Sequence, residues 1–362
     1  MAEFYSNFYT FQAVCFLFLI PIVIDHDLRG GKYSKLYDSF VAFFIACGSV
    51  YLFGSRGFDV GTDTPNYVTA YYNNLYANNV QEALGQAFLN RDPFFNLFTY
   101  YCALFFDLRG YFYVLAFIYV FLLVKAAYRI TDRYRALFLF SFLCVAYYVS
   151  MGTNVIRTGL SMSCAILALT YFLSGKKMKG ILFCVFASLF HLAAIVIVVA
   201  GLISKYIKVP QRIYGVILFI CIIMSYFGLG IKDLPFIGSY IVNSERAARY
   251  ASGDMEQAPS GLHFYTFTFQ MFSVILFYYF KNKIKDKKYD FLFDFFLILS
   301  CFYFLCLNMN YSDRFGVLSW FFIPILLFYP VRYYKLTLRY QYSLLLCVLL
   351  VYELFAIYRL IE

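Results

Sequence analysis

Arginines outside the loop clusters are the residues of this sequence best suited to chemistry. Of the 30 basic residues, 21 lie in six short clusters between long apolar runs, and eight of the other nine are arginines. A guanidinium group is planar, permanently charged and able to form two parallel hydrogen bonds, which suits an anionic ligand, most often phosphate. The scattered arginines therefore predict a binding site for an anion. The nine residues are Arg56, Arg91, Arg109, Arg157, Lys232, Arg246, Arg249, Arg314 and Arg359.

Arg157 and His191 are polar residues at unusual places in apolar segments. Arg157 follows Asn154 at the expected outer end of an apolar helix. It is either a snorkelling arginine or a charge that faces a cavity or a partner. His191 lies in the middle of the run Ile181–Ile203, where it is either a core histidine bonded to a helix carbonyl or, in a wet cavity, a candidate general base.

Three groups of acidic residues are further candidates. Asp59 and Asp63 follow Arg56 in a turn-rich stretch, where aspartates commonly only form turns. The adjacent pair Asp313–Arg314 can simply neutralise itself. The segment Asp25–Asp27 has the Asp-x-Asp pattern of a metal clamp, but it lies beside a basic cluster at the expected cytoplasmic end of a span, so we expect no catalysis there.

The composition excludes a soluble globular domain. The chain is 63% hydrophobic and only 14% charged, with a mean hydropathy of +0.70, whereas soluble domains carry about a quarter charged residues. We expect an all-α polytopic integral membrane protein. Its net charge of +10 resides mostly in loops, which indicates contact with the lipid bilayer and no nucleic-acid partner.

Apolar runs of near-spanning length predict about 11–12 transmembrane helices, one or two of them partial or broken. They form a single transmembrane domain over residues 1–362. The runs are Phe8–Ile24, Phe40–Phe53, Tyr111–Val124, Ala136–Val149, Val155–Leu173, Ile181–Ile203, Ile213–Leu229, Phe264–Phe280, Phe291–Leu307, Phe315–Tyr329 and Tyr342–Leu360, with a shorter run at Phe94–Phe106.

The positive-inside rule identifies two irregular runs. Counting Phe94–Phe106 as a full span would place the basic cluster Lys125–Arg135 outside, so we expect that run to be partial, tilted or re-entrant. Basic clusters flank Ile181–Ile203 on both sides, which a helix broken near His191 and returning to its own side would explain.

With both corrections the N-terminus and three segments lie outside, at about residues 54–93, 231–262 and 308–314. The first carries Tyr67, Tyr71, Leu75, Val80, Leu84 and Phe88 at helical spacing, which predicts an interfacial amphipathic helix.

Several short motifs occur in a characteristic order along the chain. They are Gly61-x-Asp63-x-x-x-Tyr67, Arg91-Asp92-Pro93-Phe94-Phe95, Asn154-x-x-Arg157, Phe190-His191, and Arg314 followed by a Phe-rich helix with Pro324. This ordered set resembles the EpsG family of Wzy-type exopolysaccharide and O-antigen polymerases, over about residues 51–329.

The resemblance implies a glycosyltransferase with a helical bundle like those of GT-C enzymes and related polymerases and ligases. It would work without metal or other cofactor in the bacterial inner (cytoplasmic) membrane, with its active site facing the periplasm or outside. Its substrates, both donor and acceptor, would be undecaprenyl-pyrophosphate-linked glycans, and its further partners a chain-length regulator and a flippase.

The site expected from the residues and the resemblance has two parts. The catalytic candidates are Arg157 and Arg314, for the pyrophosphate, and His191 and Asp63, for the base. The substrate-binding candidates are Arg56, Asp59, Tyr67, Arg91, Asn154, Arg246, Arg249 and Asp313.

Two other functions stay open at the level of the sequence. A flippase or transporter of lipid-linked oligosaccharides is also polytopic, but predicts broken helices in corresponding positions of two halves. A membrane acyltransferase that modifies glycans would also use an embedded histidine, together with an acyl donor.

Overall fold

The computed structural model describes residues 2–29, 35–77, 79–83, 92–132, 134–145, 147–207, 209–234, 264–333 and 340–361. All regular elements within these ranges are helices. Five helical stretches are long and apolar enough to cross a membrane, namely Ala2–Arg29, Lys35–Ser55, Leu108–Ile130, Ile156–Leu173 and Asp313–Val331, the last of which contains a turn at Phe321–Phe322. The expectation of an all-α multi-pass membrane protein is confirmed, and the total of eleven or twelve spans stays a prediction.

The chain forms two compact units. Unit 1 comprises residues 1–195 and 331–353, and unit 2 comprises 196–330 and 354–362. Helices that begin in unit 1 are α1 (Ala2–Arg29), α2 (Lys35–Ser55), α3 (Thr64–Leu75), α5 (Pro93–Phe105), α6 (Leu108–Ile130), α7 (Arg135–Cys144), α8 (Tyr148–Thr153), α9 (Ile156–Leu173), α10 (Lys177–Phe190), α11 (Ala194–Tyr206) and α19 (Gln341–Ile361). Helices that begin in unit 2 are α12 (Gln211–Tyr226), η1 (Ile231–Asp233), α15 (Phe264–Ile284), α16 (Lys287–Leu305), α17 (Asp313–Trp320) and α18 (Ile323–Tyr333).

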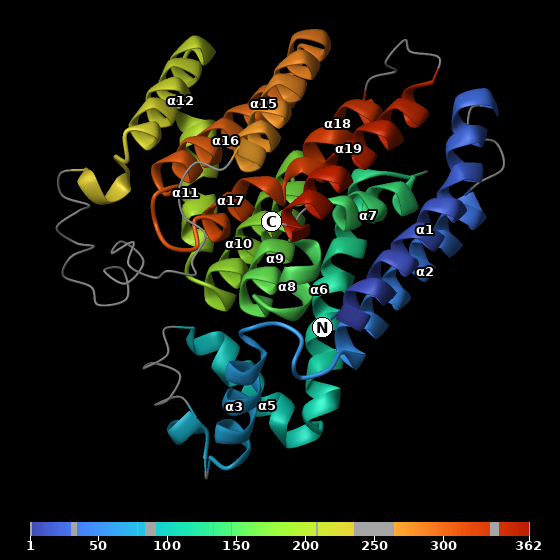
Figure 1. Ribbon diagram of the computed structural model, residues 1–362, viewed down its shortest axis with the longest axis vertical. Coiled ribbons are helices and arrows are strands. Elements are labelled where there is room, and N and C mark those ends of the chain that lie inside the picture. The colour runs from blue at the N-terminus through green and yellow to red at the C-terminus, as the bar shows by residue number, and fades with distance from the viewer. Residues whose placement is uncertain are drawn as a thin grey trace. The chain divides into compact units, whose positions relative to one another are not determined.

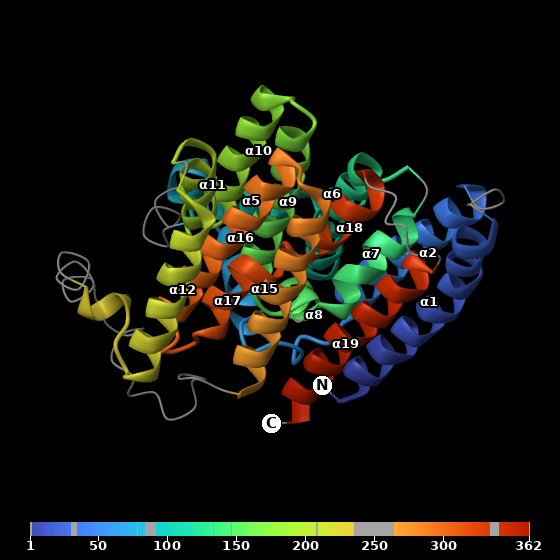
Figure 2. The same cartoon turned by 90° about the horizontal axis from the view of Figure 1, so that it is seen from above.

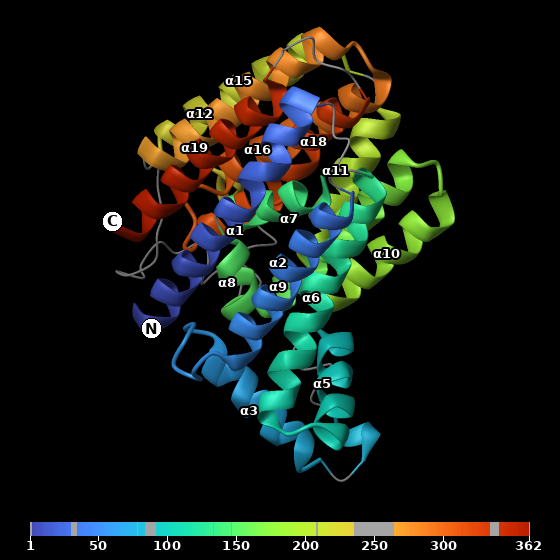
Figure 3. The same cartoon turned by 90° about the vertical axis from the view of Figure 1, so that its right-hand side faces the viewer.

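In unit 1, α1 and α2 run side by side (Figure 3). The short helices α3 and α5 pack on each other at one end of the unit, beside the beginning of α6 (Figure 1). The α5 helix has 13 residues and is therefore about 20 Å long, less than the ~30 Å hydrocarbon core. This length agrees with the partial helix expected at Phe94–Phe106. In unit 2, α12 and α15 both pack against α16 (Figure 2).

At the end of unit 1 away from α3 and α5, two carboxylates accept hydrogen bonds from the first backbone N–H groups of neighbouring helices. Asp38 of α2 accepts the backbone N–H groups of Arg135 and Ala136 at 3.0 and 3.1 Å, at the start of α7. Asp27 of α1 does the same for α19, accepting the N–H groups of Tyr342 and Ser343 at 3.0 and 2.8 Å. These bonds satisfy helix N-termini. The Asp-x-Asp pattern at Asp25–Asp27 thus has a structural use.

Two runs expected as single spans are broken. Ala136–Val149 divides into α7 and α8, with Tyr147 in the left-handed region at φ 81°, a conformation that stops a helix. Phe315–Tyr329 divides into α17 and α18 at Phe321–Phe322, where Pro324 follows without an N–H group to donate. Neither break interrupts the apolar pattern, so hydropathy alone does not reveal it.

The amphipathic helix expected from Tyr67 to Phe88 is shorter in the structure, and its aromatic residues Tyr67 and Tyr71 are buried. α3 ends at Leu75, and residues 84–91 lie outside the described ranges. Tyr67 and Tyr71 are 4% and 3% exposed. The Tyr71 hydroxyl donates to the Phe106 carbonyl at 2.7 Å, and the Tyr67 ring lies 5.8 Å from that of Phe95. The aromatic face of α3 therefore packs on protein, against α5 and its end.

Candidate active site at the ends of α5, α9 and α10

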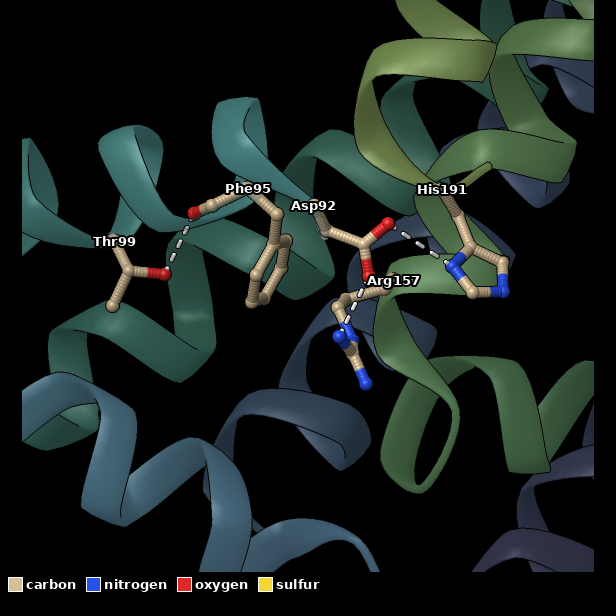
Figure 4. A network of polar contacts seen from close by, with 5 residues as sticks. All are labelled: Asp92, Phe95, Thr99, Arg157 and His191. Atoms are coloured by element: carbon tan, nitrogen blue, oxygen red, sulfur yellow. Dashed lines mark hydrogen bonds and ion pairs between the residues drawn. The ribbon is translucent and has the colours of Figure 1, made fainter. Parts of the chain in front are cut away.

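Asp92, Arg157 and His191 come together in unit 1 (Figure 4). Arg157 Nη1 donates a hydrogen bond to Asp92 Oδ2 at 2.7 Å, and His191 Nδ1 lies 3.4 Å from Asp92 Oδ1. The Asp92 side chain is only 5% exposed, whereas those of Arg157 and His191 are 29% and 23% exposed. We call these three residues the Asp92 cluster. Its carboxylate is enclosed, while its cation and its imidazole stay accessible.

Three helix ends position the Asp92 cluster. Asp92 directly precedes Pro93, the first residue of α5, and Arg157 is the second residue of α9. His191 directly follows α10 in extended conformation, with φ −157° and ψ 127°, and its carbonyl accepts the N–H of Ala194 at the start of α11. The helix break predicted near His191 is confirmed.

Close packing of α9 on α10 fixes the ends that carry the cluster. Ser161 Oγ donates to the Ala187 carbonyl of α10 at 2.8 Å, and Cys164 and Ala168 on the same side of α9 are buried. Small side chains let helix backbones approach closely. Arg157, one turn before Ser161, is therefore held by a rigid pair of helices.

Asp92 is held as a carboxylate. Burial acts to raise its pKa, but the neighbouring His191 imidazole, the Arg157 charge and the N–H of Leu192 together outweigh burial and lower the pKa below the ordinary 3.8. The enclosed Asp92 carboxylate orients both neighbours, because the Arg157 guanidinium and the His191 imidazole each contact one of its oxygens.

The N-terminal part of α3 forms a second side of the site. The Asp63 N–H donates to Asn154 Oδ1 at 2.7 Å, and the Thr62 hydroxyl lies 3.2 Å from the same oxygen. The Tyr67 hydroxyl lies beside the Arg157 guanidinium, and the Asp63 carboxylate interacts electrostatically with the same guanidinium. Asn154 therefore ties the start of α3 to the start of α9, and four predicted residues, Asp63, Tyr67, Asn154 and Arg157, gather in one place.

The turn before α3 explains the glycine of the Gly61-x-Asp63 motif. Gly61 has φ 92°, and a Cβ there would lie 3.1 Å from both Thr153 O and Asn154 Cα. A side chain would meet the α8–α9 junction in a backbone conformation that already favours glycine. The motif is thus required for the turn to dock on Asn154.

Arg56 and Asp59, predicted to bind substrate, have other surroundings. Arg56 is 4% exposed and donates to the carbonyls of Phe53 and Thr153, with its guanidinium 4.4 Å from the centre of the Phe112 ring. We interpret it as a structural anchor between α2 and α8. Asp59 is exposed in the turn after α2.

The remaining predicted residues belong to unit 2 or to ranges that the structure does not describe. Asp313 and Arg314 are the first two residues of α17 in unit 2, where the Arg314 guanidinium lies 4.5 Å from the Tyr311 ring centre. Arg91, Arg246 and Arg249 fall in the ranges 84–91 and 235–263, which the structure does not describe.

Asp92 is the central residue that sequence reasoning missed as a site residue. It occurs in the motif Arg91-Asp92-Pro93-Phe94-Phe95, and an aspartate before proline reads simply as the start of a helix. Its side chain makes no capping bond to α5 and instead pairs with Arg157. The available signal was that an arginine in an apolar helix usually pairs with a carboxylate, but sequence spacing alone does not identify which carboxylate.

Comparisons with known proteins give one result. The family model described as the EpsG family matches residues 35–362, which is most of the chain. Searches of curated proteins and of solved structures return no match. The chain therefore belongs to the EpsG family of glycosyltransferase-like membrane proteins of exopolysaccharide biosynthesis.

Proposed function

We propose that this protein polymerises oligosaccharide repeat units linked to undecaprenyl pyrophosphate, on the outer face of the cytoplasmic membrane. The observation that carries the proposal is the Asp92 cluster, in which an accessible arginine and an accessible histidine share one enclosed carboxylate. A cation for the leaving pyrophosphate and a base for the acceptor hydroxyl are the two groups that this transfer requires.

Arg157 suits the pyrophosphate. Its guanidinium has five N–H donors, and one nitrogen is committed to Asp92. The donors that remain can hold phosphate oxygens and stabilise the negative charge that grows as the glycosidic bond breaks. Arg314 is a second candidate for binding the pyrophosphate. The polyprenyl chain of the substrate would lie in the lipid bilayer.

His191 suits the acceptor. With Nδ1 facing Asp92, its Nε2 points away from the carboxylate (Figure 4). In the proposed step the acceptor hydroxyl oxygen attacks the anomeric carbon of the donor glycan. The bond from that carbon to the pyrophosphate oxygen breaks, and its electron pair leaves with undecaprenyl pyrophosphate. The hydroxyl proton passes to His191 Nε2, and Asp92 stabilises the resulting imidazolium.

Asp63 and Tyr67 extend the site along α3. Asp63 is the second candidate base, since its charge acts on Arg157 and it is part-exposed. The Tyr67 hydroxyl beside Arg157 is buried, so we assign it to orienting the guanidinium. The bacterial inner membrane, the outward-facing site, and work with a flippase and a chain-length regulator are parts of the same proposal.

The test is glycan length on a gel in a polymerase-null host complemented with wild type, His191→Ala or Arg157→Lys, with membrane levels checked. Wild type should restore a ladder, and both variants should leave single repeat units. His26→Ala is the control, because His26 is not part of the Asp92 cluster. It lies near the C-terminal end of α1, against Tyr342. A wild-type strain without a ladder, in which lipid-linked units accumulate on the cytoplasmic side, would favour a flippase instead. Dependence on an acyl donor would favour an acyltransferase.

A further inference from the structure

Two buried cysteines meet between α12 and α16 in unit 2. Cys221 of α12 and Cys301 of α16 are 5% and 8% exposed, and their thiols interact with each other side chain to side chain. The two helices pack on each other (Figure 2). Two thiols in contact can form a disulfide when the backbones that carry them already lie close together.

Hydrogen bonds near both ends of the helix pair hold α12 and α16 in register. Near the start of both helices, Gln211 Nε2 donates to Asp294 Oδ1 at 3.3 Å. Near their other ends, Asn308, just after α16, donates from Nδ2 to the Ser225 carbonyl at 3.0 Å. Both bonds join residues 83 positions apart. The helices therefore run in the same direction at a constant register, and the two cysteines lie between the two bonds.

The backbones approach each other closely just beyond the cysteine pair. A Cβ at Gly230 would lie 2.6 Å from the carbonyl oxygen of Leu305, the last residue of α16. Leu305 follows Cys301 by about one helical turn. Asn308 Nδ2 also lies 3.4 Å from the Leu229 carbonyl. This close approach, together with the contact between the thiols, is the geometry that a disulfide requires.

We propose that Cys221 and Cys301 are a redox-active pair that closes into a disulfide between α12 and α16. In this step each thiol loses its proton, one S–S bond forms, and two electrons pass to the oxidant. Because both thiols are buried, the oxidant must reach them through the bilayer. Molecular oxygen is such an oxidant, and it becomes hydrogen peroxide when it takes up the two electrons and the two protons. This inference is independent of the polymerase proposal.

The topology expected from the basic residues places the pair on the oxidising side of the membrane. Arg212 lies in the first turn of α12, and Lys287 and Lys288 begin α16, so the starts of both helices belong to the cytoplasmic side. Cys221 and Cys301 lie nearer the other ends of their helices. Disulfides form and persist outside the bacterial cytoplasm, where thiols are not kept reduced.

The disulfide would fasten the part of unit 2 from which α17 begins. α16 packs on α17, and the turn after α16 leads to Asp313 and Arg314, the first residues of α17. A covalent bond near this end of α16 would restrict motion of α12 against α16. It would also stabilise the folded chain, mainly because the bond limits the conformations of the unfolded state.

Counting free thiols tests this inference on the full protein, in nanodiscs that hold one copy each so that links between copies do not form. The reduced chain has ten cysteines. The protein is treated with copper–phenanthroline, which speeds oxidation by molecular oxygen, then denatured and labelled with maleimide–polyethylene glycol. The oxidised protein should take up two labels fewer than the untreated protein. Digestion without reductant, followed by mass spectrometry, should identify one linked pair of peptides, which contain Cys221 and Cys301.

Three variants control the measurement. Cys221→Ser and Cys301→Ser each lack one thiol of the pair, so oxidation should not lower their label count. Cys306→Ser is the matched control, because Cys306 is also buried and lies at the end of the same helix. This variant should still lose two labels. Oxidation should raise the melting temperature of wild type by about 5 °C, reversibly with reductant, and leave that of Cys301→Ser unchanged.

Wild-type protein that keeps all its labels after oxidation would overturn the proposal. So would a linked pair of peptides other than those of Cys221 and Cys301, or an equal loss of labels in Cys301→Ser, since either result would mean that oxidation does not select this pair. A Cys221–Cys301 link without a rise in melting temperature would keep the disulfide and refute its stabilising effect.

Discussion

Arg56 and Arg157 lie in the same unit, both near the C-terminal end of α8, and differ in what their guanidinium groups contact. Arg56 is 4% exposed, bonds to the backbone carbonyls of Phe53 and Thr153, and lies over an aromatic ring. The Arg157 side chain is 29% exposed and pairs with the carboxylate of Asp92. The two residues belong to the same scattered arginine set, yet one fastens helices together and the other faces outward.

This difference shows how to separate a structural arginine from a functional one. A guanidinium that spends its donors on backbone carbonyls in the interior stabilises the fold and has little left for a ligand. One that is fixed by a single carboxylate and keeps exposed donors can still bind an anion. Substitutions at the two arginines and at their partners test that contrast.

The largest effect should come from Arg157→Lys. Lysine keeps the charge but loses the planar fork that holds Asp92 and phosphate together, so we expect about a 100-fold to 1,000-fold loss of polymerisation rate. The melting temperature should change little, because the ion pair with Asp92 can persist. Repeat-unit condensation by purified protein measures the rate. A lysine variant with wild-type rate would show that the contrast between the two arginines is wrong.

Arg56→Met should have the opposite profile. It removes the guanidinium donor of the Phe53 carbonyl in a buried place, while the Thr153 carbonyl keeps the Thr64 hydroxyl as a donor. We expect this to cost about 1 to 3 kcal/mol of stability. We expect less folded protein and a lower melting temperature by size-exclusion and thermal scans. The rate per folded molecule should stay close to wild type. A folded variant that fails to extend glycans would instead place Arg56 in the substrate site.

Asp92→Asn should reduce stability in a way that depends on pH. The folded-state pKa of Asp92 lies below 3.8 because His191, Arg157 and the Leu192 N–H outweigh burial, so its carboxylate contributes stability in full above that value and loses it as pH falls through the folded pKa. The difference in melting temperature between variant and wild type should be largest at neutral pH and shrink in acid below 3.8. A difference that stays constant with pH would mean that packing, rather than charge, is what Asp92 supplies.

Asn154→Ala should have the smallest of the four effects. It removes the acceptor for the Asp63 N–H and the Thr62 hydroxyl, which costs about 1 kcal/mol and loosens the start of α3. We expect a rate reduced by roughly threefold to tenfold, with Asp59→Ala, in the neighbouring exposed turn, as the unaffected control. An equal loss in both variants would point to the turn as a whole rather than to Asn154.

Much of the fold was accessible from hydropathy, because long apolar runs can only be membrane helices in such a composition. The break at His191 was predicted from the basic clusters on both sides of it. One straight helix that crosses the membrane cannot place both clusters on the cytoplasmic side. The breaks at Tyr147 and at Phe321–Phe322 were missed. Each lies inside an unbroken apolar stretch, where a backbone turn leaves no mark on composition.

Only part of the candidate site could be predicted from the sequence. Arg157, His191, Asp63, Tyr67 and Asn154 were singled out by residue type and by motif order, and the structure brings all five together. The pairing through Asp92 could not be predicted, since it joins residues 65 and 99 positions apart through tertiary packing of α5, α9 and α10. The structural use of Arg56 was hidden for the same reason, because its partner Thr153 lies 97 residues away.

The most direct measurement of the central claim is the condensation rate of lipid-linked repeat units by purified His191→Ala protein in nanodiscs, with and without added imidazole. If His191 is the base that accepts the acceptor proton, the variant should stay folded, lose about 100-fold or more in rate, and recover part of it when imidazole is added. A variant that condenses repeat units at the wild-type rate without imidazole would contradict the account.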